Sequence, residues 1–155
     1  MNYDVIDTAE FEDVEMPQSS TAQLTQSDDI DWHLAKLVDI ANGNFGVSIG
    51  VTLTVNGALV SGLLISGKEY FESVAVELAK DSDNSVSMGL SEGMKELSEK
   101  RYGSKFNPAT HRTAFIHLKN ARHFLGGVFV PEDGTFWRGK LCDVSGFSLG
   151  LLKKN

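Results

Sequence analysis

The sequence predicts an α+β fold, mainly β, in which five short antiparallel strands bend into a small open barrel of the SH3 or Sm-like kind. Apolar residues alternate with polar or small ones from Phe45, and the hairpin signal Asn56-Gly57 follows. Further short strands with turn signals between them occupy the C-terminal third. One helix is expected before the first strand and another after the first hairpin. An ordinary α+β sheet packed on two helices is the alternative.

The N-terminal segment, residues 1–26, is predicted to be a disordered acidic arm. It contains no Lys or Arg and too little apolar surface to offset the entropy of ordering the chain. Its acids are Asp4, Asp7, Glu10, Glu12, Asp13 and Glu15. A single globular domain is expected over residues 27–152, which is long enough for one modest core.

The first helix is expected to start at Ser27 and to stop at Gly43. Ser27 would cap its N-terminus, where acidic side chains are favoured by the helix dipole. One helical face carries the apolar residues Ile30, Leu34, Leu37, Val38 and Ala41.

The first hairpin is predicted from a period of two on both sides of Asn56-Gly57, which favours a type I′ turn. This turn would pair Val55 with Ala58, Leu53 with Val60, Val51 with Gly62 and Ile49 with Leu64. The second strand is then apolar on both faces, because Leu59, Leu63 and Ile65 lie opposite the other set. Gly62, near its middle, would permit a sharp bend.

Ser66-Gly-Lys-Glu69 is a capping box that predicts a helix in which Tyr70, Phe71, Val74 and Leu78 face inward. Residues 81–112 are polar and rich in serine, which indicates an insertion with little core. Within it, Leu90, Met94 and Leu97 could support a short amphipathic helix.

Extended structure is predicted again for residues 113–124. Turns are expected at Gly126-Gly127 and at Pro131–Gly134, because glycine and proline favour turns. Two final strands are expected over about 135–142 and 147–152.

No catalytic, cofactor or metal site is predicted. The histidines lack the spacing and the supporting ligands of a metal site, which favours surface or hydrogen-bonded histidines. Cys142, the single cysteine, excludes an internal disulfide and is expected to be a buried, inert thiol in a reducing cytoplasm. The glycines at 43–67 match no phosphate-binding motif.

The predicted partner-binding face is a row of aromatic and cationic residues on the penultimate strand. If Trp137, Gly139 and Leu141 face the core, Phe136, Arg138 and Lys140 project together from the other side. Lys119 and Arg122 could extend this face. The alternative is that Phe136 packs under the insertion while the cations are merely solvated.

The net charge of −7 is distributed unevenly. Residues 1–99 carry 18 acidic and 4 basic side chains, whereas residues 100–155 carry 3 acidic and 10 basic ones. The basic half could bind an anionic partner or the acidic half of another copy, or the charges could average out in space. No apolar run is long enough to span a membrane, and no secretory signal is evident.

Three blocks resemble the gas vesicle accessory protein U family. They occur in the family's order, over roughly residues 30–152, and run from Asn56 to Phe71 (NGALVSGLLISGKEYF), from Phe115 to Ala121 (FIHLKNA) and from Phe136 to Gly150 (FWRGKLCDVSGFSLG). The resemblance implies a non-enzymatic cytoplasmic accessory of protein-shelled gas vesicles, which associates with itself and promotes vesicle clustering. Gas vesicle shell proteins would be its partners. An Sm-like RNA-binding module is the alternative, against which the net negative charge counts.

Overall fold

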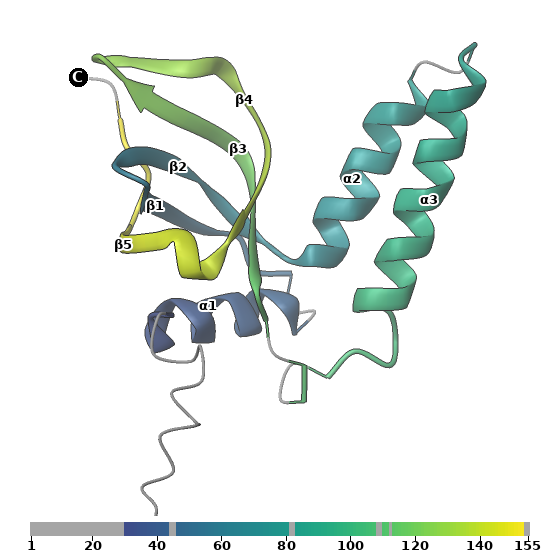
Figure 1. Cartoon of the computed structure of the whole chain (residues 1–155), viewed down its shortest axis with the longest axis horizontal. Coiled ribbons are helices and arrows are strands. Elements are labelled where there is room, and N and C mark those ends of the chain that lie inside the picture. The colour runs from purple at the N-terminus through teal and green to yellow at the C-terminus, as the bar shows by residue number, and fades with distance from the viewer. Residues whose placement is uncertain (1–29, 44–45, 81–82, 108–109, 112, 154–155) are drawn as a thin grey trace, which may run out of the picture.

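The computed structural model describes residues 30–43, 46–80, 83–107, 110–111 and 113–153. In this part of the chain it has three α-helices and a five-stranded antiparallel sheet, which confirms the α+β class (Figure 1). The elements in order are α1 (Trp32–Asn42), β1 (Ile49–Val55), β2 (Ala58–Ile65), α2 (Gly67–Ala79), α3 (Ser85–Tyr102), β3 (Phe115–Leu125), β4 (Val128–Lys140), the 3₁₀ turn η1 (Leu141–Asp143) and β5 (Val144–Leu149).

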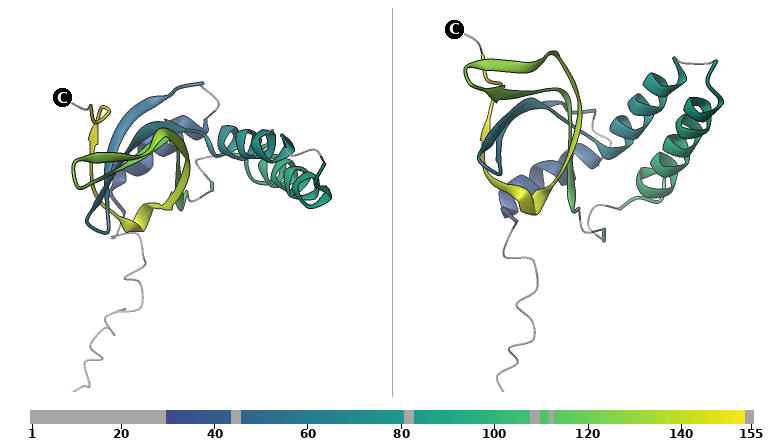
Figure 2. Two further views of the ribbon diagram at one scale, coloured as in Figure 1. Left: turned by 90° about the horizontal axis from the view of Figure 1, so that it is seen from above. Right: turned by 45° about the horizontal axis from the view of Figure 1, so that its top comes forward.

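The sheet has the strand order β4-β3-β2-β1-β5 and curls strongly, with α1 across one end of the curl (Figure 2). Its two edge strands, β4 and β5, are not paired with each other in the described residues, so the sheet is not closed. The SH3 or Sm-like barrel therefore stays a prediction. The helical hairpin formed by α2 and α3 projects to one side of the sheet (Figure 1).

Helix α1 begins later than the sequence predicted. The predicted cap, Ser27, lies outside the described residues together with the acidic arm, and Asp31 caps the helix. Its Oδ1 accepts hydrogen bonds from the backbone N–H groups of His33 (2.8 Å) and Leu34 (3.1 Å). The predicted stop at Gly43 is confirmed.

The register of the β1–β2 hairpin is confirmed at all four predicted pairs. The turn works because Asn56 and Gly57 both have positive φ, 49° and 81°, as a type I′ turn requires. This register directs alternate apolar side chains of both strands into the curl of the sheet, where they meet α1. The resulting core consists of Leu34, Val38, Ala41, Val51, Leu53, Val60, Leu64, Ile116, Leu118, Ala121, Leu141 and Val144.

Gly62 lies where the β2–β3 ladder is irregular. The register shifts between Ser61 and Leu63, and a Cβ on Gly62 would lie 3.0 Å from Ala121 Cα and 3.1 Å from the Lys119 carbonyl oxygen. The glycine therefore lets β3 approach β2 closely at the bend.

Gly62→Val is expected to lower the free energy of unfolding by roughly 1–3 kcal/mol, because its branched side chain meets backbone atoms that cannot move aside cheaply. Urea unfolding at equilibrium measures the change. Gly89→Val is the control for a valine at a glycine with open space around it. It should not destabilise the chain, because valine has a slightly higher helix propensity than glycine. Equal stability of Gly62→Val and the parent chain would contradict a close approach at this point.

The C-terminal strands differ from the prediction in their limits. The turn at Gly126-Gly127 is confirmed, with φ of 56° and 89°, but the turn predicted at Pro131–Gly134 is wrong because β4 continues through it. A β-bulge lets the strand continue past Pro131 and Gly134. The β3–β4 register shifts on both sides of Ala121, and Gly134, with φ of 77°, packs on Asn120. The last strand runs over Val144–Leu149 rather than 147–152, since η1 makes the preceding corner.

The helix α3 is longer than predicted and packs through a different face. It has 18 residues, and its buried residues are Ser91 and Ser98, while Leu90 and Leu97 are exposed. Ser91 Oγ donates to the carbonyl oxygen of Ala75 (2.8 Å) on α2, and Ser98 Oγ donates to that of Lys68 (3.4 Å). Small side chains let the two antiparallel helices approach closely. The stabilisation gained from this close packing exceeds what burial of the leucine side chains would give.

Candidate functional site: a cationic aromatic groove

A second, small core lies outside the curled sheet, between its outer face and the helical hairpin. Ile65 on β2 and His117 on β3 are cross-strand partners and are fully buried, and the rings of Tyr70 and Phe71 on α2 lie against His117. Of the second apolar face predicted for β2, Ile65 lies in this small core, whereas Leu59 and Leu63 are half-buried.

His117 corrects the prediction of surface or hydrogen-bonded histidines. Neither ring nitrogen has a hydrogen-bond partner, and the ring is surrounded by Tyr70 (4.8 Å between centroids), Phe71 (6.0 Å) and Tyr102 (6.0 Å). Burial, with a smaller contribution from the charge of Arg138, lowers the pKa of His117 to about 3. The imidazole is therefore neutral at physiological pH. In the described parts of the chain, no group of three or more His, Cys, Asp or Glu residues could hold a metal ion.

Beside this core, the sheet and the hairpin enclose a groove of about 380 Å³, which we call the cationic groove. Arginines approach it from both sides, Arg101 from α3 and Arg138 from β4. Its walls are otherwise mostly aromatic and apolar. The lining residues are Phe71, Leu97, Arg101, Tyr102, Phe106, His111, Thr113, Ala114, Phe115 and Arg138.

Arg138 is held in place by an aromatic ring. Its Cζ lies 3.5 Å from the centroid of Phe115, the geometry of a cation–π contact. Burial raises the pKa of Tyr102, and the positive charges of Arg138 and Arg101 oppose that rise. The phenol therefore stays protonated, and the groove presents two permanent positive charges over aromatic surface.

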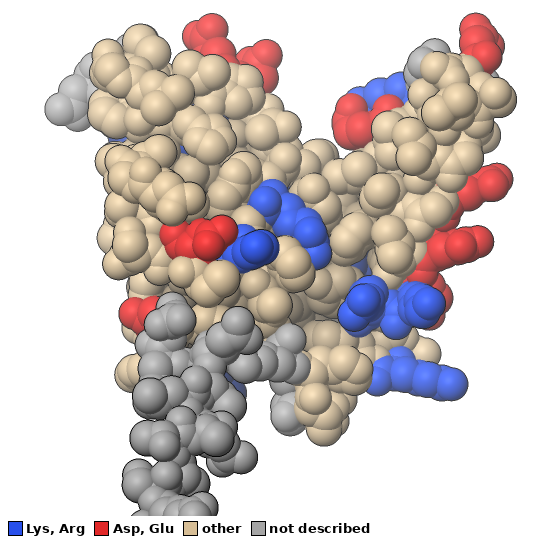
Figure 3. All heavy atoms as spheres, in the orientation of Figure 1, with Lys and Arg blue, Asp and Glu red and all other residues tan. Residues whose placement is uncertain are grey.

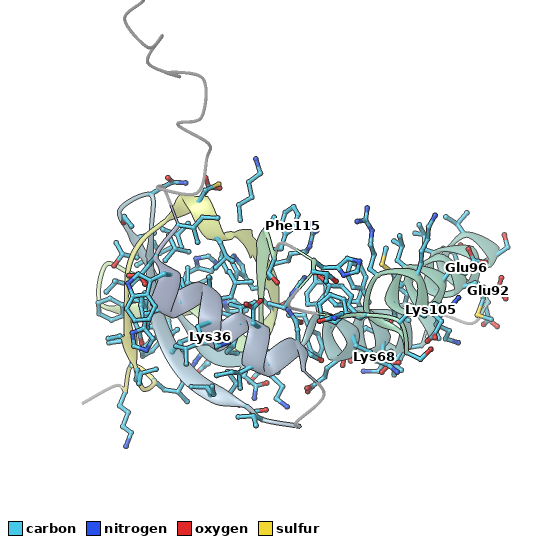
Figure 4. All side chains as sticks on the ribbon, turned by 90° about the horizontal axis from the view of Figure 1, so that it is seen from below. Lys36, Lys68, Glu92, Glu96, Lys105 and Phe115 are labelled. Carbon is cyan, nitrogen blue, oxygen red and sulfur yellow. The ribbon has the colours of Figure 1, made fainter. Side chains whose placement is uncertain are left out.

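Lys140 continues the cationic row out of the groove. It is the cross-strand partner of Phe115, as Arg138 is that of His117, so both cations project from the same face of β4. Both are exposed. In Figure 3 one group of basic side chains lies in the middle of the view with an acidic group directly beside it. A second basic group lies at the lower end of the hairpin, and acidic side chains line the hairpin's outer edge. Figure 4 likewise shows Glu92 and Glu96 on α3, far from Phe115.

Phe136, the third member of the predicted row, is half-buried. Its ring makes an edge contact with Tyr70 on α2, with 6.3 Å between centroids. Phe136 therefore matches neither prediction in full: it is not fully exposed beside the cations, and it does not pack under the 81–112 segment.

Lys119 and Arg122 lie apart from the groove. Lys119 Nζ is 2.7 Å from Glu69 Oε1 and links β3 to α2. Among the described residues, the Glu69 carboxylate has Lys119 as its partner, and not the Ser66 amide that the capping box predicted. The other half of the capping box is confirmed, because Ser66 Oγ accepts from the Glu69 N–H (3.0 Å). Arg122 lies over the Phe129 ring, 4.6 Å from its centroid.

Sequence reasoning missed the wall of the groove that the hairpin and the residue Phe106 after it supply: Phe71, Arg101, Tyr102 and Phe106. Tyr102 is placed by Gly67, where a Cβ would overlap the Tyr102 ring. Nothing in the local pattern around Arg101 indicates that it meets β4, since 36 residues separate it from Trp137. Cys142 was also predicted wrongly: it is exposed, because η1 turns Leu141 into the core instead.

A second hollow, of about 690 Å³, lies at the start of α1 and is shallower. It is lined by Ile30, Asp31 and Trp32 on one side, and by Asn56 and residues 142–145 on the other. It carries acids rather than cations, so it does not resemble the cationic groove. It does show that the N-terminus of the described chain lies beside Cys142 and Asp143.

The profile of one protein family, described as gas vesicle protein GvpU-like, matches residues 31–152. This match covers most of the chain and confirms the resemblance seen in the three sequence blocks. The match assigns the chain with this curled sheet and helical hairpin to the gas vesicle accessory proteins. The chain belongs to the GvpU-like family.

No curated protein and no solved structure matched the chain. None of the helices in the described residues is long and apolar enough to cross a membrane.

Proposed function

We propose that the protein is a non-enzymatic, cytoplasmic accessory that associates with itself and binds gas vesicle shell proteins, thereby clustering vesicles. Family membership supports the link to gas vesicles. The observation that carries the binding mode is the exposed pair Arg138 and Lys140 at the mouth of an aromatic groove. We further propose that the curled sheet is an open barrel of the SH3 or Sm-like kind, which presents this face beside the hairpin.

The chemistry of the site suits a partner surface that combines acidic and apolar groups. An arginine stacked on an aromatic ring loses little freedom when it binds a carboxylate, and guanidinium groups accept carboxylates in a bidentate manner. Phe136 and Lys119 would border the contact, and Arg122 with Phe129 would form its far edge. Aromatic and arginine side chains are the residues that interfaces favour.

Single-stranded RNA is the second candidate partner, because arginines over aromatic rings can also hold stacked bases. The net charge of −7 disfavours it. A phosphate-contacting surface would lose RNA affinity steeply as salt rises, and titration of a fluorescent oligonucleotide at several salt concentrations would reveal this.

Arg138→Glu combined with Lys140→Glu is expected to abolish association with purified gas vesicles and between copies of the chain. The substitutions change the charge of the face by about four units and place like charges against an acidic surface, a penalty that reaches several kcal/mol. Centrifugation with vesicles at moderate salt and analytical ultracentrifugation without them measure the two associations. Thermal unfolding should change little, since both side chains are exposed.

Lys36→Glu combined with Lys153→Glu is the matched control, because it makes the same change in net charge at exposed lysines outside the groove lining. Figure 4 shows Lys36 on α1, away from Phe115. The control should associate like the parent chain. Undiminished association of the groove variant would refute the assignment and direct attention to the 81–112 segment.

A further inference from the structure

We infer that the cationic groove is a docking site for the chain's own acidic segment, residues 4–15, which binds within the same copy and covers the face that contacts vesicles. The regulatory part of this inference rests on the proposed function, whereas the docking itself does not. The occupant is a peptide in which acids alternate with apolar side chains, and the groove offers arginines over aromatic walls.

Charge complementarity is the first argument. Residues 1–26 carry six acids and no Lys or Arg, so no internal cation competes for them. Two of the acids on α3, Glu92 and Glu96, lie far from Phe115 (Figure 4). The Asp39 carboxylate accepts a hydrogen bond from Thr113 of the groove lining (2.8 Å). Arg101 and Arg138 are therefore the cations of the groove that can pair with an added acidic strand.

The apolar residues of the segment also match the groove. Val5, Ile6, Phe11 and Val14 are interspersed among the acids. In the groove, Leu97 is 40% exposed, and the rings of Tyr102 and Phe106 lie 5.3 Å apart between centroids. A docked apolar side chain would cover this surface while its acidic neighbours reach the arginines.

The entry point of the segment is the third argument. Ile30 and Asp31 line the same hollow as Cys142 and Asp143, and Cys142 is two residues beyond Lys140 and four beyond Arg138. At about 3.3 Å per residue of extended chain, Arg138 lies within roughly 15 Å of Cys142. The described chain therefore begins, at Ile30, at the foot of the cationic row that leads to the groove.

The tether makes a weak interaction sufficient. About 14 residues join the acidic segment to Ile30. A random coil of that number of residues has an average end-to-end distance of about 20 Å. The effective concentration of a segment held in this way is of the order of millimolar. Docking would thus be substantial even if the free peptide bound with a dissociation constant near that value, and it would weaken as salt screens the charges.

Paramagnetic relaxation enhancement in the full chain tests the docking. A nitroxide at Thr8→Cys, in a Cys142→Ser background, should broaden the amide signals of Leu97, Arg101 and Phe115 at low salt. Arg101→Glu combined with Arg138→Glu should reduce the enhancement at Phe115 severalfold. The Lys36→Glu and Lys153→Glu pair should leave it unchanged.

Two results would overturn the inference. One is that the amide signals of the groove are not broadened, or that their broadening does not change in the Arg101→Glu and Arg138→Glu variant. The other is broadening of an isotope-labelled chain without nitroxide when it is mixed with an unlabelled, spin-labelled chain, which would place the segment in the groove of another copy.

The regulatory consequence has its own readout. Neutralising the six acids should abolish the enhancement and raise the fraction of chain that associates with vesicles severalfold. The substitutions are Asp4→Asn, Asp7→Asn, Glu10→Gln, Glu12→Gln, Asp13→Asn and Glu15→Gln. If the wild-type enhancement is present but vesicle association does not rise, docking stands and the regulatory part fails. If the enhancement is absent from the wild-type groove, the inference fails whatever the vesicles do.

Discussion

Acidification from pH 6.5 to pH 4.5 is expected to cost the fold about 2 kcal/mol through His117 alone. Burial in an aromatic layer lowers the pKa of this residue to about 3, against an ordinary value of 6.5. Above pH 6.5 the imidazole is neutral in the folded and the unfolded chain, so it contributes no pH dependence. Below pH 6.5 the imidazole is protonated in the unfolded chain but stays neutral in the folded chain. The free energy of unfolding therefore falls by up to about 1.4 kcal/mol per pH unit until pH approaches 3.

His117→Leu should remove this dependence. Leucine has no nitrogen atoms to leave without a hydrogen bond in the aromatic layer, so stability near pH 8 should be equal to or greater than that of the parent chain. Urea unfolding at a series of pH values measures both effects. Titration of carboxylates contributes to every variant, and the difference between variants isolates the histidine.

His33→Gln is the control, because His33 is exposed on α1. It should keep the full loss of stability between pH 6.5 and 4.5. An equal acid dependence in the parent chain and in His117→Leu would mean that the imidazole is hydrated or paired in solution. In that event the hairpin would not seal the outer face of the sheet.

Ser91→Leu is expected to destabilise the protein by about 3 kcal/mol, although it replaces a polar residue with an apolar one in a helix. The Ser91 side chain is 2% exposed and lies against Ala75, which is 0% exposed. Leucine would push α3 away from α2 by overpacking and remove the bond to the Ala75 carbonyl oxygen. Because α3 also supplies Arg101 and Tyr102, the cationic groove should open as well.

Leu90→Ser is the matched control, since Leu90 is the neighbouring residue and is 49% exposed. Its effect should stay within about 0.5 kcal/mol, as is usual for surface positions. Thermal unfolding followed by circular dichroism compares the two variants. A reversed order, with Leu90→Ser the more damaging, would show that α3 packs through its leucine face.

Local features of the sequence determined the hairpin at Asn56-Gly57, its register, the start of α2 at Ser66 and the stop of α1 at Gly43. Each depends on a few adjacent residues whose backbone preferences or capping side chains act within one turn. The alternation of apolar residues determined which face of β1 is buried. The sequence alone also indicated the family, and it indicated that Arg138 and Lys140 lie on the same face of one strand.

Long-range packing decided the rest. The continuation of β4 through Pro131 depends on a bulge opposite Asn120. Ser91 rather than Leu90 is buried in α3 because α2 lies so close. The burial of His117 depends on a helical hairpin that begins 50 residues earlier in the chain. The groove has the same origin, because Arg101 and Arg138 meet only after the hairpin folds against the sheet. Periodicity reports which side chains share a face, but the partner of that face is set by the tertiary structure, where the closest packing outweighs local preference.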